Sequence, residues 1–201
     1  MEESKNERKI ILFMHMSLDG IISGPEGELD WATMDPEIGE FMIPNLLETV
    51  DTMILGRMLY LGFEKAWPAM AKNPASPKDI VDFANWIEDS PKVVFTHSDE
   101  KLSWTNTQQI QIKTDEDIVN GVANLKKIQG GDIVLFGGAR IAQTFVRLGL
   151  VDEYRIKLEP ILLGEGTRLF EKINSKSKLK LVESKRFDPS GVVVLYYQNI
   201  K

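Results

Sequence analysis

Four short apolar runs are spaced along the first two thirds of the chain. They span residues 9–16, 52–55, 93–96 and 133–136. Continuous apolar runs of this length are typical of strands that are buried on both faces. We therefore expect these four segments to form the centre of a mostly parallel sheet.

The segments that separate these runs have the apolar spacing of helices. They cover residues 38–50, 76–88, 116–128 and 139–148, with a shorter helical stretch at 58–63. A chain that alternates between strand and helix forms crossover units, in which helices pack on both faces of one parallel sheet. The sequence thus predicts an α/β protein.

The last fifty residues have a different pattern. Residues 154–158, 178–187 and 192–199 are predicted strands, and the Asp-Pro-Ser-Gly sequence at 188–191 is typical of a hairpin turn. Antiparallel strands are therefore expected to complete the sheet. Residues 66–77, which contain three prolines, are predicted to form an exposed loop. With 201 residues and 43% hydrophobic content, we expect one domain covering residues 1–201.

Composition excludes several classes of function. The net charge is −6 and no basic run occurs, so a nucleic-acid partner is not expected. The absence of cysteine and of a long apolar stretch favours a cytoplasmic protein without a membrane segment. Neither histidine belongs to a His-x-x-x-His or Glu-x-x-His pair, and there is no Gly-x-Ser-x-Gly sequence, so neither a metal site nor a serine nucleophile is predicted.

A glycine pair, Gly137-Gly138, follows the fourth apolar run and precedes a helix that carries Arg140 in its first turn. Glycine lets a ligand approach the backbone closely, and the helix N-terminus offers N–H groups to an anion. A tight strand-to-helix turn without a ligand is the alternative. The spacing matches neither the G-x-G-x-x-G fingerprint nor a P-loop.

Two other predicted strands end in similar chemistry. Gly56-Arg57 follows the second run, and Thr96-His97-Ser98 ends the third. An arginine at a helix N-terminus can pair with a phosphate through two N–H groups. Ligands of open α/β sheets bind outside the carboxyl ends of the strands. The three strand ends together predict one extended polyanionic ligand.

These residues resemble the dihydrofolate reductase-like superfamily, and in particular the reductase domain of bacterial riboflavin biosynthesis. The motifs extend over nearly the whole chain: Ser17-Leu18-Asp19-Gly20, Leu55-Gly56-Arg57, Val93-Val94-Phe95-Thr96 ahead of Ser98, Ile133 to Arg140, Leu150-Val151-Asp152-Glu153, and Pro160 followed by Gly164-Glu165-Gly166. The resemblance implies a dihydrofolate reductase-like fold, with an antiparallel C-terminal hairpin, and a stand-alone member of this branch.

The resemblance also implies a cofactor site. It assigns Gly137, Gly138, Ala139, Arg140 and Ile141 to the pyrophosphate and nicotinamide side, Gly56 and Arg57 to the phosphate region, and Thr96, His97 and Ser98 to the adenosine end. Arg57 near the ribose favours NADPH over NADH. The chain departs from the family at Leu59, where a threonine usually offers a hydrogen bond to phosphate.

The substrate side rests on three residues in and after the loop that follows the first strand. Asp19 and Asp35 are candidate proton donors, and Asp19 and Trp31 candidate substrate contacts. The alternatives are an Asp-Gly turn for Asp19, a helix cap for Asp35 and a core anchor for Trp31. His15, within an apolar strand, is predicted to be a hydrogen-bonded core residue.

We therefore expect an NAD(P)H-dependent reductase that transfers a hydride to a small planar heterocycle, carbonyl or imine. The alternative is a non-catalytic nucleotide-binding or regulatory protein that kept the fold, which Leu59 favours. The resemblance and the apolar run at 192–197 predict a homodimer, although this run could equally fill the core.

Overall fold

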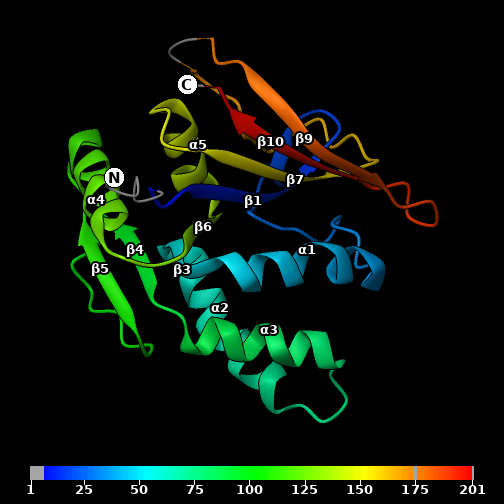
Figure 1. Cartoon of the computed structure of the whole chain (residues 1–201), viewed down its shortest axis with the longest axis horizontal. Coiled ribbons are helices and arrows are strands. Elements are labelled where there is room, and N and C mark those ends of the chain that lie inside the picture. Colours follow the sequence, from blue (N-terminus) through cyan, green and yellow to red (C-terminus); the bar gives the residue numbers. More distant parts are fainter. Residues whose placement is uncertain (1–6, 174–175, 201) are drawn as a thin grey trace, which may run out of the picture.

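The computed structural model describes residues 7–173 and 176–200. Helices and strands alternate along the first three quarters of the chain (Figure 1). The helices are α1 (Pro36–Thr49), α2 (Arg57–Lys72), α3 (Lys78–Asp89), α4 (Asp115–Lys127) and α5 (Ala139–Arg147). The strands are β1 (Ile10–Ser17), β2 (Ile21–Ser23), β3 (Val50–Gly56), β4 (Lys92–Thr96), β5 (Thr107–Gln111), β6 (Asp132–Gly137), β7 (Glu153–Glu159), β8 (Thr167–Arg168), β9 (Leu179–Arg186) and β10 (Val193–Asn199).

Eight of the described strands form one sheet in the order β5-β4-β3-β6-β1-β7-β10-β9. All pairs from β5 to β7 are parallel, and β10 pairs antiparallel with both β7 and β9. The four apolar runs are therefore confirmed as neighbouring central strands, and the α/β class with a mostly parallel sheet is confirmed. The hairpin turn is also confirmed, because Gly191 N–H donates to the Phe187 carbonyl at 2.8 Å.

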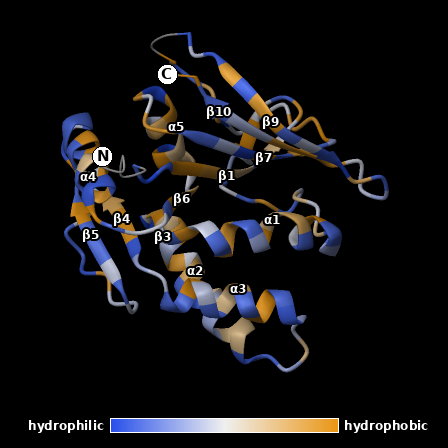
Figure 2. Ribbon diagram, in the orientation of Figure 1, coloured by the Kyte–Doolittle hydropathy of each residue, from blue (hydrophilic) through white to orange (hydrophobic). Residues whose placement is uncertain are grey.

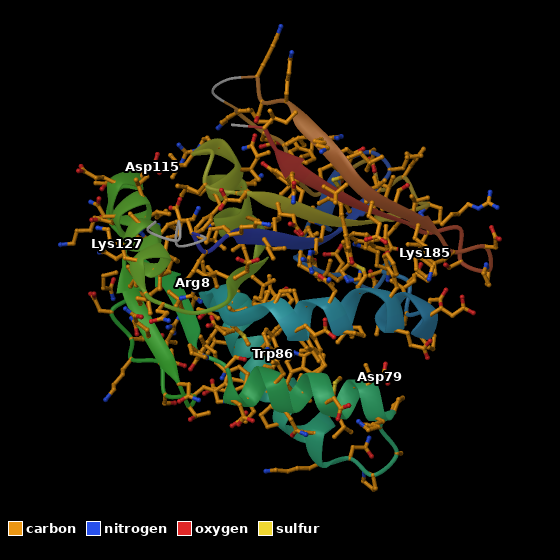
Figure 3. The ribbon with its side chains drawn as sticks, viewed as in Figure 1. Arg8, Asp79, Trp86, Asp115, Lys127 and Lys185 are labelled. Atoms are coloured by element: carbon orange, nitrogen blue, oxygen red, sulfur yellow. The ribbon has the colours of Figure 1, made fainter. Side chains whose placement is uncertain are left out.

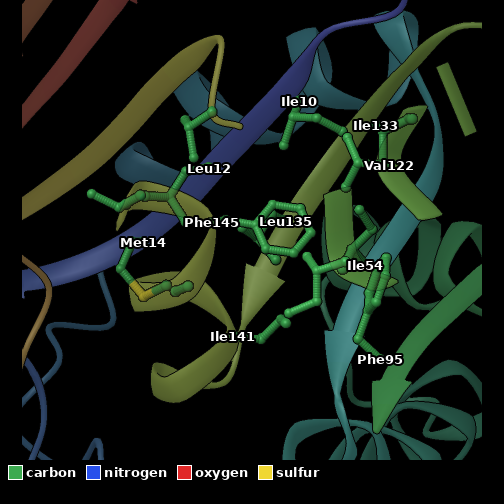
Figure 4. Close-up of a cluster of buried hydrophobic side chains, with 14 of the residues drawn as sticks. Ile10, Leu12, Met14, Ile54, Phe95, Val122, Ile133, Leu135, Ile141 and Phe145 are labelled. Carbon is green, nitrogen blue, oxygen red and sulfur yellow. The ribbon is translucent and has the colours of Figure 1, made fainter. Parts of the chain in front are cut away.

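Helices cover both faces of this sheet, as the alternation predicts. On one face, α4 and α5 pack their apolar side chains against Ile10, Leu12 and Leu135 (Figure 4). On the other face, α1, α2 and α3 pack against Ile11 and Val134. Successive residues of β1 thus enter opposite halves of the core. Figure 2 shows the corresponding mixture of hydrophobic and hydrophilic residues around α1 and α3.

The expectation of a loop over residues 66–77 is wrong for its first half. Helix α2 continues to Lys72 and contains Pro68. Trp67 stabilises this part of the helix, because its ring packs against Phe63 and Phe83 at centroid distances of 5.6 and 5.1 Å. Tertiary packing therefore outweighs the cost of a proline inside the helix. Only residues 73–77 connect α2 to α3.

Three strands have no counterpart in the predicted elements. Strand β5 is polar (Thr-Gln-Gln-Ile-Gln) and lies at the edge of the sheet, so it lacks the apolar run that marks a central strand. The short strands β2 and β8 pair with each other outside the main sheet. Within the described residues, no helix is long and apolar enough to cross a membrane.

The apolar run at 192–197 fills the core with alternate residues. Val192, Val194 and Tyr196 are buried against α1, whereas the intervening residues are half-buried on the other face. Strand β9 covers the outer edge of β10. Edge-to-edge pairing of two chains through β10 is therefore blocked, and β9 is the edge strand at this end of the sheet, as β5 is at the other.

Candidate functional site

The three predicted strand ends lie side by side. Strands β4, β3 and β6 are consecutive and parallel, so their carboxyl ends meet at one edge of the sheet. In the strand registers, Gly56 is paired with Phe95 and Leu55 with Gly137. The structure therefore brings together the ends that carry Gly56, Thr96 and Gly137.

The glycines at this edge let the backbone pack closely at Gly56 and Gly137 and leave it open at Gly138. A Cβ on Gly56 would lie 3.3 Å from Ile141 Cγ2 and 3.5 Å from the Gly137 carbonyl oxygen. Gly137 has a φ of +94°, which disfavours other residues, and a Cβ there would lie 3.0 Å from Met14 Cε. At Gly138, no heavy atom lies within 4 Å of the Cβ position. The backbone at Gly138 thus faces open space.

Helix α5 begins at this open space. Gly138 is its N-cap and provides no side-chain hydrogen bond, while its carbonyl accepts from Ile141 N–H and Ala142 N–H, each at 3.1 Å. The N–H groups of the first helical turn, at Ala139 and Arg140, have no intrahelical acceptor in a helix of this kind. With the exposed side chain of Arg140, they give this corner of the molecule a positive potential.

Arg57 is the first residue of α2. It directly follows β3, the strand next to β6 in the sheet. One nitrogen, Nη2, forms an ion pair with Glu100, whose side chain is 74% exposed, whereas the Arg57 side chain is 24% exposed. The other nitrogen, Nη1, is buried and has no hydrogen-bond partner in the described residues. A buried guanidinium N–H without an acceptor is costly, and an oxygen of a bound anion would satisfy it.

The Thr96-His97-Ser98 segment is fixed by local hydrogen bonds. The Thr96 hydroxyl is buried and accepts from Ser98 N–H at 3.0 Å, so it is used within the turn. His97 Nδ1 lies 2.7 Å from the Ile112 carbonyl and therefore donates to it. The Ser98 carbonyl accepts from the side-chain amides of Gln109 and Gln111. The exposed His97 ring and the Ser98 side chain remain at the surface of this edge.

Asp19 ties two loops together. Its carboxylate accepts from the Ser17 hydroxyl at 2.7 Å and from the N–H groups of Leu163 and Gly164 at 3.1 and 2.9 Å. The hydrogen bond from Ser17, followed by those from Gly164 and Leu163, lowers the pKa of Asp19 from 3.8 to about 2. A carboxyl that is ionised at neutral pH is poorly suited to donating a proton. The structure therefore favours the turn role over the catalytic one.

Asp35 and Trp31 lie in the segment that leads into α1. Asp35 is the N-cap of α1, where its side chain accepts from Glu37 N–H at 3.0 Å, which is the capping alternative. Trp31 is half-buried, and its indole N–H lies 3.3 Å from the Glu28 carbonyl. Its ring remains partly accessible.

A buried charged network on the sheet was missed by the sequence analysis. Glu159 Oε1 lies 3.1 Å from His15 Nδ1 and 3.3 Å from Lys157 Nζ, and Oε2 accepts from Thr33 N–H at 3.2 Å. Lys157 also donates to the Thr33 carbonyl. His15 is thus hydrogen-bonded as predicted, but its side chain is 30% exposed rather than fully buried.

The charge of Glu159 is stabilised by this network. Burial alone would raise the pKa of Glu159, but hydrogen bonds from His15 and Thr33 and the charge of Lys157 together outweigh burial and hold the pKa below its usual 4.5. A sequence signal existed: charged residues alternate with apolar ones along β7 (Glu153, Arg155, Lys157 and Glu159), which is unusual for a strand inside a sheet.

The two central strands separate beside this network. The paired residues of β1 and β6 end at Leu12 and Leu135, after which β1 continues to pair only with β7, as far as Ser17. A separation of neighbouring strands at their carboxyl ends is where open α/β sheets bind ligands. His15 lies three residues beyond Leu12, in the part of β1 that pairs with β7 and no longer with β6.

Half-buried aromatic rings gather next to this separation. Phe136 contacts Phe13, Phe63 and Trp86 at centroid distances of 5.7, 5.9 and 6.4 Å. Trp67 joins the group through Phe63. We call these five rings the aromatic surface. Trp86 lies on the side of α3 that faces α1 (Figure 3). None of the described residues forms a group of three or more metal-ligating side chains.

A family model for the RibD C-terminal domain matches residues 8–193. The chain belongs to the RibD C-terminal domain family. The Bacillus subtilis (strain 168) protein YyaP, described as uncharacterized, is 33% identical over 199 residues, which cover 99% of this chain and 100% of YyaP.

Solved structures agree with this assignment. A putative riboflavin biosynthesis protein from Shewanella sp. PV-4 has a TM-score of 0.69 and 23% identity over 96% of this chain and 99% of that one. Dihydrofolate reductase from Enterococcus faecalis, complexed with NADP(H) and RAB-propyl, has a TM-score of 0.59 and 16% identity over 96% of this chain and 97% of that one. The chain therefore has a dihydrofolate reductase-like, reductase-type fold.

Proposed function

We propose that the chain is an NADPH-dependent reductase that acts on a small planar heterocycle, carbonyl or imine. One observation carries the proposal. The Gly56 Cβ position lies 3.5 Å from the Gly137 carbonyl oxygen and the Gly138 nitrogen, beside the uncapped N-terminus of α5 and open space at Gly138. Bare backbone and unpaired N–H groups at adjacent strand ends suit a dinucleotide pyrophosphate.

The residues at this edge fit the dinucleotide in other respects. Gly138, Ala139, Arg140 and Ile141 would hold the pyrophosphate and the nicotinamide side through the first turn of α5. The free Nη1 of Arg57 would bind the 2′-phosphate, which favours NADPH over NADH.

The adenosine end would lie against the exposed His97 ring and Ser98. Thr96, whose buried hydroxyl accepts from Ser98 N–H, would contribute the shape of the turn.

The substrate would lie where β1 and β6 separate. There the aromatic surface offers ring faces and edges to a planar molecule, and the partly accessible Trp31 ring is a further candidate contact. The bound cofactor would supply a hydride, and the chain would orient the substrate and keep water from the reacting atoms.

Two measurements test this function. NADPH should quench the tryptophan fluorescence of the chain at lower concentration than NADH. Loss of NADPH absorbance should then follow addition of a folate, a pterin, a ribityl pyrimidine or a quinone. A chain that binds neither dinucleotide would refute the proposal.

The second candidate is a nucleotide-binding protein without catalysis. It is favoured by Leu59, which packs partly buried against the core on the α2 side and offers no hydroxyl to a phosphate. Saturable NADPH binding without oxidation of the cofactor by any of the four substrate classes would favour this candidate.

We also propose a cytoplasmic homodimer. Every residue of β9 is exposed, and the strand includes Leu181 and Val182 with relative exposures of 48 and 52%. An exposed edge strand with apolar side chains favours association with a second copy. Light scattering of the intact chain would give the mass, and a monomer at micromolar concentration would refute the dimer.

A further inference from the structure

The network around Glu159 is nearly enclosed by protein. The side chains of Glu159 and Lys157 are 1% and 5% exposed, while the His15 side chain is 30% exposed. His15 and Lys157 are directly paired across β1 and β7, and Glu159 is paired with Ser17 two residues further along. The three side chains therefore point to the same face of the sheet, which is the face that α1 covers.

Stability alone does not explain this network. The cost of removing two charges from water roughly cancels their attraction, so a buried ion pair is often no more stabilising than apolar side chains of similar size. On the same face of the sheet, the neighbouring strand β10 has Val194 beside Lys157, and Val192 directly precedes this strand. Buried ionisable groups that are retained near a ligand cleft are candidates for chemistry.

The position of His15 relates the network to the reductase site. His15 lies on β1 beyond the last residue that pairs with β6, and the preceding residue, Met14, reaches to within 3.0 Å of a Cβ position on Gly137. His15 is the next residue along β1, in the part of the strand beyond its pairing with β6, and its side chain is on the opposite face of the sheet from Met14. This is the face that carries Phe13 and Phe136.

Glu159 determines which ring nitrogen of His15 is available. The carboxylate accepts a hydrogen bond, so Nδ1 carries a proton, and no described residue forms a hydrogen bond with Nε2. This arrangement leaves Nε2, on the accessible part of the ring, to exchange a proton with a ligand.

We propose that His15 is the catalytic proton donor of this reductase and that Glu159 is its positioning residue. The inference rests on the proposed function. The hydride brings two electrons from NADPH to the acceptor carbon, and the double bond to oxygen or nitrogen becomes a single bond. The imidazolium gives its Nε2 proton to that heteroatom, and the neutral ring regains a proton from solvent. The sum is NADPH, one proton and substrate, giving NADP⁺ and reduced substrate.

The charged groups that face His15 are known for each element packed against it. Strand β7 contributes Glu159 and Lys157. The Glu159 carboxylate contacts both His15 and Lys157. The segment before α1 contributes the backbone of Thr33, and the nearby Asp35 side chain is bound to its own helix. Asp19 is ionised and bound to three donors, so it is poorly suited to donating a proton.

The first test uses NMR and needs no substrate. The chain has two histidines, so ¹⁵N-histidine labelling gives two sets of ring signals, and His15→Gln identifies the His15 set. We expect the His15 signals to show a protonated Nδ1 in the neutral ring and to shift on addition of NADP⁺. Glu159→Gln should redistribute the proton between the nitrogens. His15 signals that do not respond to saturating NADP⁺ would overturn the inference.

The second test uses NADPH oxidation with dihydrofolate and with 9,10-phenanthrenequinone as probes. His15→Gln should lower kcat by about 100-fold while leaving NADPH binding unchanged, because general acids contribute roughly 10²- to 10⁴-fold. The wild-type kcat should fall as pH rises, because the donor must carry its proton, and this dependence should be absent from His15→Gln. Glu159→Gln should change kcat more than KM and shift the pH dependence.

The outcomes separate the two proposals. Failure of the wild-type chain to bind NADPH would refute the proposed function, whatever His15 does. Turnover of a probe with the same kcat and the same pH profile in His15→Gln would overturn only the proton-donor assignment. If neither probe is oxidised, the NMR result decides whether His15 lies at the bound nicotinamide.

Discussion

Phe136 meets Phe13 edge-to-face, with ring centroids 5.7 Å apart and ring planes inclined by 70°. The two rings belong to β6 and β1, directly after the last residues through which these strands pair. Gly137 and Gly138 follow Phe136 in the chain. The contact therefore lies where the aromatic surface adjoins the glycine corner along the chain.

Replacing Phe136 by alanine should reduce both stability and substrate binding. Removal of a large aromatic side chain from packed surroundings costs about 3 to 5 kcal/mol, and the partial exposure of Phe136 favours the lower end of that range. Urea denaturation measures this loss. In folded Phe136→Leu, the KM for a planar substrate should rise while the Kd for NADPH stays the same. A Kd that rises with KM would contradict the separation of substrate and cofactor contacts.

Gly138→Val should abolish dinucleotide binding without unfolding the chain. No protein atom lies within 4 Å of the Cβ position, so the new side chain would occupy the space proposed for the pyrophosphate. We expect the Kd for NADPH, followed by fluorescence quenching, to rise by about 100-fold or more, equivalent to roughly 3 kcal/mol. Gly62→Val is the matched control, because Gly62 in α2 also has open space around it. An unchanged Kd in Gly138→Val would exclude this corner.

The ion pair between Arg57 and Glu100 should compete with the cofactor. Glu100→Gln should therefore tighten NADPH binding by about 2- to 5-fold, because an exposed pair is worth up to about 1 kcal/mol. Arg57→Glu should abolish the preference for NADPH over NADH and weaken binding of both. Equal NADPH and NADH affinities in the wild-type chain would contradict a 2′-phosphate contact at Arg57.

Asp19 should make stability depend on pH at the acid end. Because folding lowers its pKa from 3.8 to about 2, its contribution is complete above the unfolded-state value and is lost as pH falls through about 2. Asp19→Asn should therefore lower the urea midpoint at neutral pH, and the two midpoints should converge as the pH falls toward 2. Asp30→Asn, at an exposed loop position, is the control. A constant difference between Asp19→Asn and wild type would contradict this role.

The strand ends could be predicted because each has a strong local signal. Gly56 and Gly137 follow apolar runs directly, and parallel strands place such ends at one edge. The length of α2 could not be predicted, because Pro68 is a local helix breaker and only the packing of Trp67 on Phe83 compensates for it.

The charged network shows a different reason for failure. His15 and Lys157 are distant in the sequence and meet only through the pairing of β1 with β7. Single-sequence patterns carry no information about that register. The alternation of charge along β7 shows that its charged residues share one face of the strand. It does not show which residues of the neighbouring strand they meet.

The position of β6 has a consequence for how the chain matures. This strand inserts between β1 and β3, both of which are made much earlier, so Gly137 and Gly138 reach Gly56 only after the first two thirds of the polypeptide have been synthesised. Contacts between such remote segments form slowly, because a long loop must close first. A nascent chain that ends before β6 lacks one side of the proposed nucleotide cleft. The onset of dinucleotide binding during synthesis would therefore show that β6 has taken its place between β1 and β3.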